Sequence, residues 1–221
     1  MSDLAKTIET LGHLVAFPTV SSDSNLELFN WAADRLNEAG ARVEVMPALE
    51  EGKANLYATI GPEVSGGIVL SGHTDVVPVE GQPWTSDPFA MEERDGLLFG
   101  RGTADMKGFV AACIAVAPWF AAQPLARPVH FAFTYDEETG CLGGREMARA
   151  LAERDPRPAI VIVGEPTNMA IIEGHKGCHE YLTRFTGLAG HGSNPGLGVN
   201  AVEYAVRYVG KLLEIRDGLA A

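Results

Sequence analysis

Cysteine is scarce in this chain and is not arranged in pairs. The 221 residues contain three cysteines, Cys113, Cys141 and Cys178, with no C-x-x-C spacing among them. An odd and scattered set argues against a disulfide-stapled secreted domain and against a zinc-finger-like site. We therefore expect a protein of a reducing compartment. Hydrophobic residues make up 46% of the sequence, which is enough for a sizeable core.

Positive charge and long apolar segments are also in short supply. The 17 lysines and arginines face 29 aspartates and glutamates, giving a net charge of −12, which argues against nucleic acid or an anionic membrane as a partner. The longest apolar run, 109–122, is too short to span a bilayer and contains Pro118. The opening segment MSDLAKTIET holds no apolar signal-peptide core. These features predict a cytoplasmic protein.

Helix and strand patterns alternate through the first three quarters of the chain. They predict helices over 3–16, 25–39, from about 107 and over 143–154, strands over 42–46, 54–60, 67–70, 128–135 and 159–163, and a hairpin around 94–96. Strands joined by crossover helices are typical of an α/β fold with a mainly parallel sheet flanked by helices. The short apolar runs among them are expected to be buried strands.

A change in composition near 170–180 predicts the start of a second domain. Residues 178–185 (CHEYLTRF) alternate as a half-buried strand does, and a Gly-rich loop follows. The apolar residues of the next segment recur with helical spacing: Val202, Ala205, Val206, Val209, Leu212 and Leu213. One strand and one helix cannot bury a core of their own. We expect one domain over 1–175 and the beginning of an α+β domain over 176–221.

Four acidic segments carry the chemistry of the chain. They are SGHTDVVP (71–78), GRGTADMKG (100–108), TYDEETG (134–140) and VGEPT (163–167). Three of them directly follow an expected strand, and active sites of open α/β sheets lie at the carboxyl ends of their strands. An imidazole and several carboxylates brought together there form a ligand set for one or two divalent metal ions. So much negative charge at one sheet edge needs cations to compensate it.

His73 and Asp75 are two residues apart, so in extended backbone their side chains point to the same side. This spacing suits a metal-ligating imidazole with a carboxylate that orients it. Asp105 lies in a turn between two glycines and has two readings: a carboxylate that bridges two cations, or a cap of the helix that begins near Lys107. GRGTAD approaches a dinucleotide-binding fingerprint, but Asp105 stands where its last glycine would be, which excludes that site.

Glu137 and Glu138 are adjacent and project in different directions. One can therefore bind metal while the other faces the reacting water as general base. Glu165 follows the apolar run AIVIVG, where a carboxylate without a partner would be costly. His191 lies in the Gly-rich loop, where a lone histidine is most often a surface residue. Ser193 lacks a G-x-S-x-G elbow, which argues against a serine hydrolase.

The remaining histidines fall outside these segments. His13 is expected on a helix surface and His130 in a strand, whereas His175 and His179 lie near the domain junction with no assigned role.

Together the motifs resemble the M20 family of metallo-aminoacylases and peptidases. The resemblance runs through GHTDVVP, WTSDPF, GRGTADMKG, DEETG, GEPT, HKG, GHGSNP followed by GVNA, and the closing LEIRD. Within the family the motifs look most like those of deacetylases acting on N2-acetyl-L-ornithine, with desuccinylases of succinyl-diaminopimelate as close kin. The resemblance implies a zinc-exopeptidase-like catalytic domain over 1–175 and the first strand and helix of a lid or dimerisation domain over 176–221.

The resemblance also implies roles for the site residues. His73 and Glu165 would bind one metal ion, Asp105 would bridge, and Glu138 would bind the other, with zinc or cobalt as the ions. Asp75 would support His73 and Glu137 would be the general base. His191 would stabilise the oxyanion, typically in the partner subunit of a homodimer.

The implied substrate is a small N-acyl amino acid, with arginine biosynthesis as the setting. The family also places a further histidine ligand far downstream, and no remaining histidine here stands in an equivalent context. We therefore expect the N-terminal portion of a longer enzyme or a truncated product, with an incomplete second metal site.

Overall fold

The computed structural model describes residues 3–174, 177 and 181–219. These residues divide into two compact units, Met1–Ile171 and Ile172–Ala221, each of which is treated by itself. The boundary lies four residues before the one expected from composition. The assignment of the two parts as a catalytic domain and a lid domain stays a prediction.

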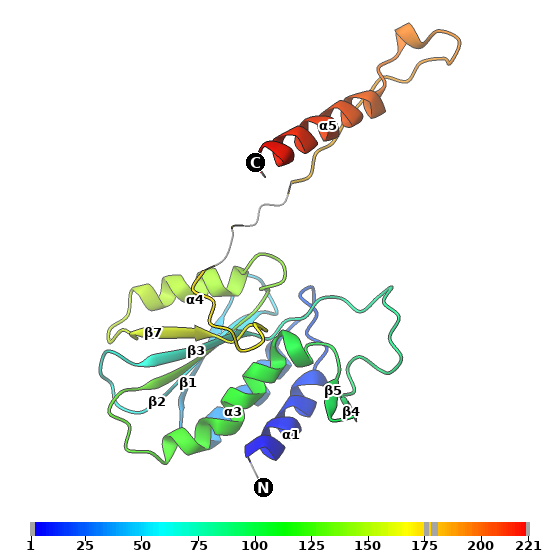
Figure 1. Cartoon of the computed structure of the whole chain (residues 1–221). Helices are drawn as coiled ribbons and strands as arrows, with labels where there is room; N and C mark the ends of the chain where they lie inside the picture. The colour runs from blue at the N-terminus through cyan, green and yellow to red at the C-terminus, as the bar shows by residue number, and fades with distance from the viewer. Residues whose placement is uncertain (1–2, 175–176, 178–180, 220–221) are drawn as a thin grey trace. The chain divides into compact units, whose positions relative to one another are not determined.

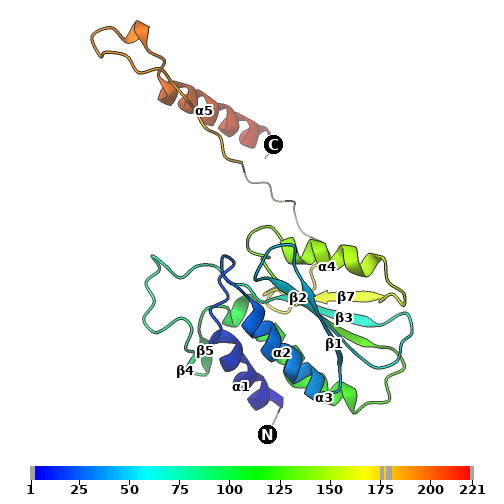
Figure 2. The same ribbon diagram turned by 180° about the vertical axis from the view of Figure 1, so that it is seen from behind.

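The first unit is a five-stranded sheet with helices on both faces, as Figures 1 and 2 show. Its strands are β1 (Arg42–Pro47), β2 (Ala54–Ile60), β3 (Ile68–His73), β6 (Val129–Thr134) and β7 (Ile160–Val163), arranged in the order β1-β2-β6-β3-β7. The β1–β2 and β2–β6 pairs are antiparallel, whereas β6–β3 and β3–β7 are parallel. The predicted α/β class is confirmed. The sheet is mixed because β2 runs against the other four strands.

Three helices cover one face of the sheet and a fourth covers the other (Figures 1 and 2). The first face carries α1 (Asp3–Val15), α2 (Leu26–Glu38) and α3 (Gly108–Ala121), and the opposite face carries α4 (Leu142–Ala152). The chain crosses from β3 through α3 to β6, and then from β6 through α4 to β7 on the other side of β3. The sheet thus changes its winding direction around β3, which is where open α/β sheets bind their ligands.

The hydrophobic core lies between the sheet and its three-helix face. Leu14, Leu28, Leu36, Phe131 and Phe133 are among its fully buried members. By length and composition alone the segment Thr103–Ala121 could cross a membrane. In the structure it consists of a turn followed by α3, and α3 buries one side in this core.

A short hairpin stands apart from the main sheet, as the sequence predicted. Its arms are β4 (Glu92–Arg94) and β5 (Leu97–Phe99), which pair antiparallel. Asp95 and Gly96 between them both have positive φ angles, of 53° and 73°. Two consecutive residues with positive φ are typical of the tight turn whose twist matches a β-hairpin.

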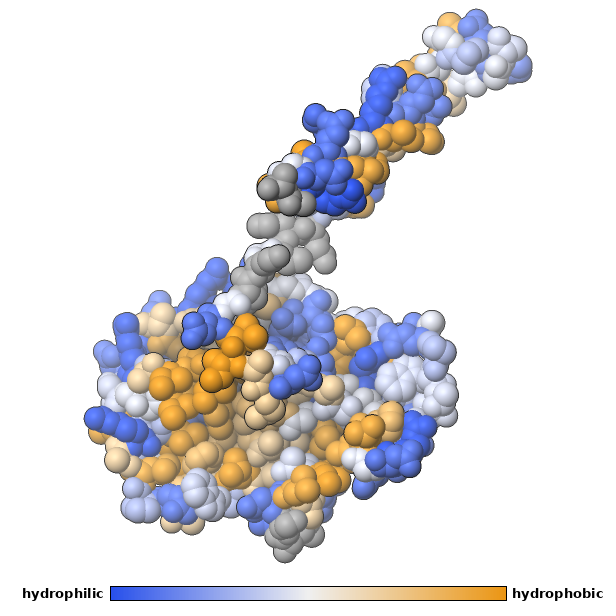
Figure 3. Space-filling model, in the orientation of Figure 1, coloured by the Kyte–Doolittle hydropathy of each residue, from blue (hydrophilic) through white to orange (hydrophobic). Residues whose placement is uncertain are grey.

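The prediction that the run 159–163 is buried is wrong. The β7 side chains Ile160, Val161, Ile162 and Val163 are all exposed. β7 is the edge strand of the sheet, next to β3, and among the described residues no strand pairs with its outer side. Figure 3 shows apolar residues gathered on the side of the first unit where Figure 1 labels β7. Successive side chains of a strand point to opposite faces, so exposure of all four means that neither face of β7 is covered within the described residues.

In the second unit, α5 (Ala201–Leu219) confirms the predicted helix. A short 3-10 turn, Pro195–Leu197, and a single bridge between Leu188 and Val199 precede it. The predicted strand over 178–185 is wrong for the part that is described, since residues 181–185 form no strand there. Residues 178–180 lie outside the described residues. Alternation alone does not make a strand, because a strand needs a neighbour for its backbone hydrogen bonds.

The core predicts a sharp difference between two leucine substitutions. Leu56 is fully buried in β2 and pairs with Phe133 across the sheet, whereas Leu97 is 62% exposed in the hairpin. We expect Leu56→Ala to lower the free energy of unfolding by about 3 kcal/mol, through lost apolar burial and the cavity left behind. Leu97→Ala should change it by less than about 0.5 kcal/mol. Urea denaturation measures both, and equal losses would contradict this placement of the core.

Candidate metal centre

The carboxyl ends of three parallel strands meet at one edge of the sheet. In the β3–β6 register His73 lies opposite Thr134, and in the β3–β7 register Ser71 lies opposite Val163. The segments that follow β6 and β7 therefore leave the sheet beside His73, the last residue of β3. This placement confirms the expected meeting of three of the acidic segments at one edge.

His73 is the buried centre of the site. Its side chain is almost completely shielded from solvent. The ring Nδ1 lies 3.0 Å from the main-chain carbonyl oxygen of Asp75, and because a carbonyl only accepts, Nδ1 carries a proton. The other ring nitrogen, Nε2, lies 3.0 Å from Asp105 Oδ1 and 3.7 Å from Glu165 Oε1. Nε2 is therefore the nitrogen that can bind a cation, with its orientation fixed by the bond at Nδ1.

Asp105 reaches the site from a wide turn, Thr103–Lys107, between the hairpin and α3. The turn opens at Gly102, which has a φ of +84°. A Cβ at this position would lie 2.7 Å from the Val76 side chain. Both the positive φ and the lack of space favour glycine. The alternative reading of Asp105 as a helix cap is wrong. Lys107 occupies the cap position of α3, no side-chain capping bond forms there, and the Asp105 carboxylate points to His73 instead.

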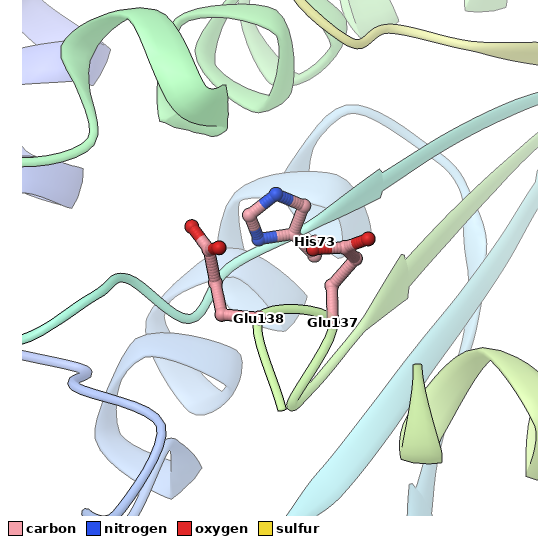
Figure 4. Close-up of side chains that lie close together, drawn as sticks. All are labelled: His73, Glu137 and Glu138. Atoms are coloured by element: carbon pink, nitrogen blue, oxygen red, sulfur yellow. The ribbon is translucent and has the colours of Figure 1, made fainter. Parts of the chain in front are cut away.

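Glu137 and Glu138 lie in the turn that follows β6. Figure 4 shows their carboxyl groups on either side of the His73 ring. The backbone N–H groups of both residues donate to the Asp75 carboxylate, that of Glu137 at 3.1 Å and that of Glu138 at 3.3 Å. The thiol of Cys141 lies 3.5 Å from Glu137 Oε1. Asp75 thus contacts both the histidine and the acidic turn.

Glu165 approaches from the segment after β7. Gly164 makes this approach possible, because a Cβ there would lie 2.0 Å from the Phe109 ring. Burial and the negative charges of Asp105 and Glu137 raise the pKa of Glu165 to about 7, although the nearby His73 lowers it. A carboxyl group in these surroundings is stabilised by a proton or by a cation.

Burial, neighbouring charges and hydrogen bonds together set the titration of the site. Burial opposes a charge on His73, but Asp75, Glu165 and Asp105 outweigh it and raise the pKa of the imidazole to about 9. Burial and the charge of Asp105 also raise the pKa of Glu138. For Asp75, burial is outweighed by hydrogen bonds from His73, Ser21 and the Glu137 N–H, so that its pKa is lowered.

Within the described residues two groups of three side chains can each hold a metal ion. One consists of His73, Glu137 and Glu138, and the other of His73, Asp105 and Glu165, with the candidate ligand atoms of each group within 4.8 Å of one another. One imidazole nitrogen and several carboxylate oxygens form a donor set that suits zinc, cobalt or manganese. The donors present therefore fit a divalent cation at this edge.

The other histidines take no part in this cluster where they are described. His13 lies on α1 against the Trp31 ring, and His130 lies in β6 stacked on Tyr57. His191 belongs to the second unit, where its Nδ1 accepts the backbone N–H of Ser193. Its predicted role stays a prediction. His175 and His179 lie outside the described residues.

Three buried polar residues that touch the site were missed by the sequence interpretation. Ser21 donates to Asp75, Lys53 pairs with Asp136 next to the acidic turn, and Lys107 donates from the Asp105 turn to the carbonyl oxygens of Leu14 and Phe17. Of the three, only Lys107 could have been noticed from the local sequence, because a lysine directly before a strongly apolar helix is either exposed or paired.

Comparison with known proteins agrees with this geometry. The model of peptidase family M20/M25/M40 matches residues 69–214. Acetylornithine deacetylase from Photorhabdus laumondii is 41% identical over 219 residues, which cover 96% of this chain and 56% of the relative. The chain thus spans about half the length of that curated relative.

Two solved structures share the fold of the first unit. Human carnosine dipeptidase 1 is 28% identical with a TM-score of 0.63, over 72% of this chain and 38% of that one. The M20 family metallo-carboxypeptidase Sso-CP2 from Sulfolobus solfataricus is 20% identical, also with a TM-score of 0.63, over 72% of this chain and 37% of its own. With a family match over more than half of its length, the chain belongs to peptidase family M20/M25/M40.

Proposed function

We propose that this chain forms the catalytic part of a metal-dependent amide hydrolase that removes the acetyl group from N2-acetyl-L-ornithine, giving L-ornithine and acetate. The observation that carries the proposal is 41% identity to an acetylornithine deacetylase over nearly the whole chain. The cluster of His73 with four carboxylates at the sheet edge supports it chemically. The proposed setting is arginine biosynthesis in the cytoplasm.

The metal ligands in this proposal are His73, Asp105, Glu138 and Glu165. His73 and Glu165 would hold one ion, Asp105 would serve both, and Glu138 would hold the second. The distances from His73 Nε2 to Asp105 and Glu165, 3.0 and 3.7 Å, support the first of these groupings. Zinc or cobalt suits a site with a nitrogen donor. When bound, such ions polarise the amide carbonyl and lower the pKa of water.

The protein's own residues then move the proton and hold the reacting groups in place. Glu137, beside the ligands but on a different side of His73 from Glu138, takes a proton from the attacking water and passes it to the leaving amine. Asp75 keeps the Nδ1 side of the imidazole fixed, so that Nε2 stays directed at the carboxylates. His191, contributed by the partner subunit of a homodimer, stabilises the oxyanion.

In the same proposal residues 1–175 are a catalytic domain and 176–221 begin a lid or dimerisation domain. Desuccinylation of succinyl-diaminopimelate, or another aminoacylase or carboxypeptidase reaction of the family, is the enzymatic alternative. A second alternative is an inactive fragment. Metal content separates the inactive fragment from the enzymatic readings, since a complete site holds about two ions.

Substrate preference tests the proposed reaction directly. We expect the protein that carries this chain, loaded with Zn2+ or Co2+, to release acetate from N2-acetyl-L-ornithine. Its kcat/KM for this substrate should exceed that for N-succinyl-diaminopimelate by at least about tenfold, a margin that differential contacts in a pocket supply. The reverse preference would assign the chain to the desuccinylases.

A substitution of Glu137 separates base from ligand. We expect Glu137→Ala to lower kcat by about 10³-fold or more, because the proposal assigns Glu137 the proton of the attacking water. Bound metal, measured by elemental analysis, should stay unchanged. Glu51→Ala, at an exposed loop position, is the matched control and should retain activity. Loss of metal in the Glu137 variant would make Glu137 a ligand instead of a base.

Proton release on metal binding tests the charge state of the site. Because the pKa of His73 is raised to about 9 and that of Glu165 to about 7, a cation at pH 8 must displace the proton on His73. We expect about one proton to be released at pH 8 when the ion at His73 binds, and more at pH 6 where Glu165 is also protonated. Calorimetric titration with Co2+ in buffers of different ionisation enthalpy measures this number. Zero release at pH 8 would show that His73 is not the ligand.

A further inference from the structure

The acidic turn after β6 is held from outside the metal cluster. Glu137 and Glu138 both donate their backbone N–H groups to one carboxylate, that of Asp75, which is itself 98% shielded from solvent. Where this carboxylate points therefore decides where both glutamate side chains begin. The contacts that orient the Asp75 carboxylate therefore affect the geometry of the whole site.

Ser21 fixes the orientation of that carboxylate. Its buried hydroxyl, in the loop between α1 and α2, donates to Asp75 Oδ2 at 2.7 Å. The loop is tied to the same strand end by further bonds: Ser21 N–H to Val76 O, Val76 N–H to Thr19 O, and the Thr19 hydroxyl to Thr74 O. The hydroxyl is therefore presented from a rigid frame, and it occupies one of the few acceptor positions that the two oxygens offer.

Lys53 fixes the start of the turn. Its ammonium group, 3% exposed, lies 2.8 Å from Asp136 Oδ1 and 2.6 Å from the carbonyl oxygen of Ser21. Asp136 has a φ of 50°, a left-handed conformation that costs free energy in residues other than glycine. The buried ion pair holds Asp136 in this conformation, from which the chain turns to place Glu137 and Glu138.

Ser21 joins both arrangements. Its side chain holds Asp75 and its carbonyl oxygen holds Lys53, so a single residue is linked to the turn by two separate routes. The two contacts come from parts of the sequence far apart, at 54 and 32 residues from Ser21. Buried hydrogen bonds of this kind fix the orientation of the groups that they join as well as stabilising the fold, because each bond requires a particular donor–acceptor geometry.

We propose that Ser21 and Lys53 are positioning residues for the Glu137–Glu138 pair: they act through Asp75 and Asp136, respectively, and set the distance of both glutamates from His73. This inference deepens the proposed function and rests on it for the metal, but not for the geometry of the turn. Neither residue touches the reacting atoms.

Amide hydrogen exchange in the metal-free 221-residue chain tests the geometry without any metal. In Ser21→Ala we expect the Glu137 and Glu138 amides to exchange about tenfold faster, because their acceptor loses its anchor. Ser24→Ala is the matched control: it removes a hydroxyl of the same loop that is bonded to Gly52 O at 2.8 Å and to the Leu26 N–H but not to Asp75. Ser21→Thr, which keeps the hydroxyl, should restore the slow exchange.

Cobalt titration of the same variants tests the consequence for the site. We expect the Co2+ dissociation constant to rise about tenfold or more in Ser21→Ala and to stay unchanged in Ser24→Ala, as for other losses of groups that support ligands. Unchanged exchange at both amides would overturn the proposal, and so would faster exchange with unchanged cobalt affinity. If the unaltered chain binds no Co2+, the proposed metal site fails, and the exchange rates alone decide on the positioning role.

A test of the positioning role of Lys53 requires a variant that still folds. Lys53→Met alone leaves Asp136 as a buried unpaired charge, so the double variant Lys53→Met/Asp136→Asn is used, since asparagine tolerates a positive φ. We expect faster exchange at Glu137 and Glu138 in the double variant than in Asp136→Asn alone, which keeps Lys53 bonded to Ser21. Equal rates in the two variants would remove Lys53 from the positioning role.

Discussion

The buried carboxylate of Asp75 is the group on which the geometry of the site depends. Its oxygens receive the Ser21 hydroxyl and the backbone N–H groups of the acidic turn, and its main-chain carbonyl receives the imidazole N–H of His73. Burial alone would raise the pKa of this group, yet its donors hold the pKa low. Asp75 therefore stays ionised in a position almost without water. One charged residue sets the directions of two strand ends at once.

The site is built against the electrostatic preference of the folded chain. Several carboxylates meet at one sheet edge around a single imidazole, and their burial and mutual repulsion raise the pKa values of Glu138 and Glu165. In the absence of a metal ion, the positive charge of the doubly protonated His73 ring offsets part of this repulsion. A bound divalent ion replaces that proton with more charge. The fold thus places these carboxylates close together despite their repulsion, and a bound cation would relieve that repulsion.

The sequence predicted those parts of the site that depend on local pattern. Apolar runs followed by acids placed His73, Glu137 and Glu165 at strand ends, and parallel strands bring such ends together whatever the details of packing. The same reasoning failed for β7, because an edge position and a buried position have the same composition. It also left Asp105 ambiguous between ligand and cap, since both readings need an aspartate before a helix.

Long-range contacts could not be predicted from local pattern. Lys53 directly precedes β2, and nothing around it in the sequence indicates an ion pair with a residue 83 positions away. Ser21 is likewise one of several serines in a polar loop. Their roles follow only from the fold, which brings the loop after α1, the start of β2 and the ends of β3 and β6 to one place.

The two groups of metal-ligating side chains are chemically unequal because they share one imidazole. A single Nε2 lone pair serves one ion, and its distances favour the group with Asp105 and Glu165. That ion meets nitrogen and oxygen donors, which suit zinc or cobalt. From the residues that the structure describes, an ion beside Glu138 meets only carboxylate oxygens, which suit harder ions such as manganese. In the proposed two-ion site the ion at His73 would therefore bind first and, by partly neutralising Asp105, would change the electrostatic field in which the second ion binds.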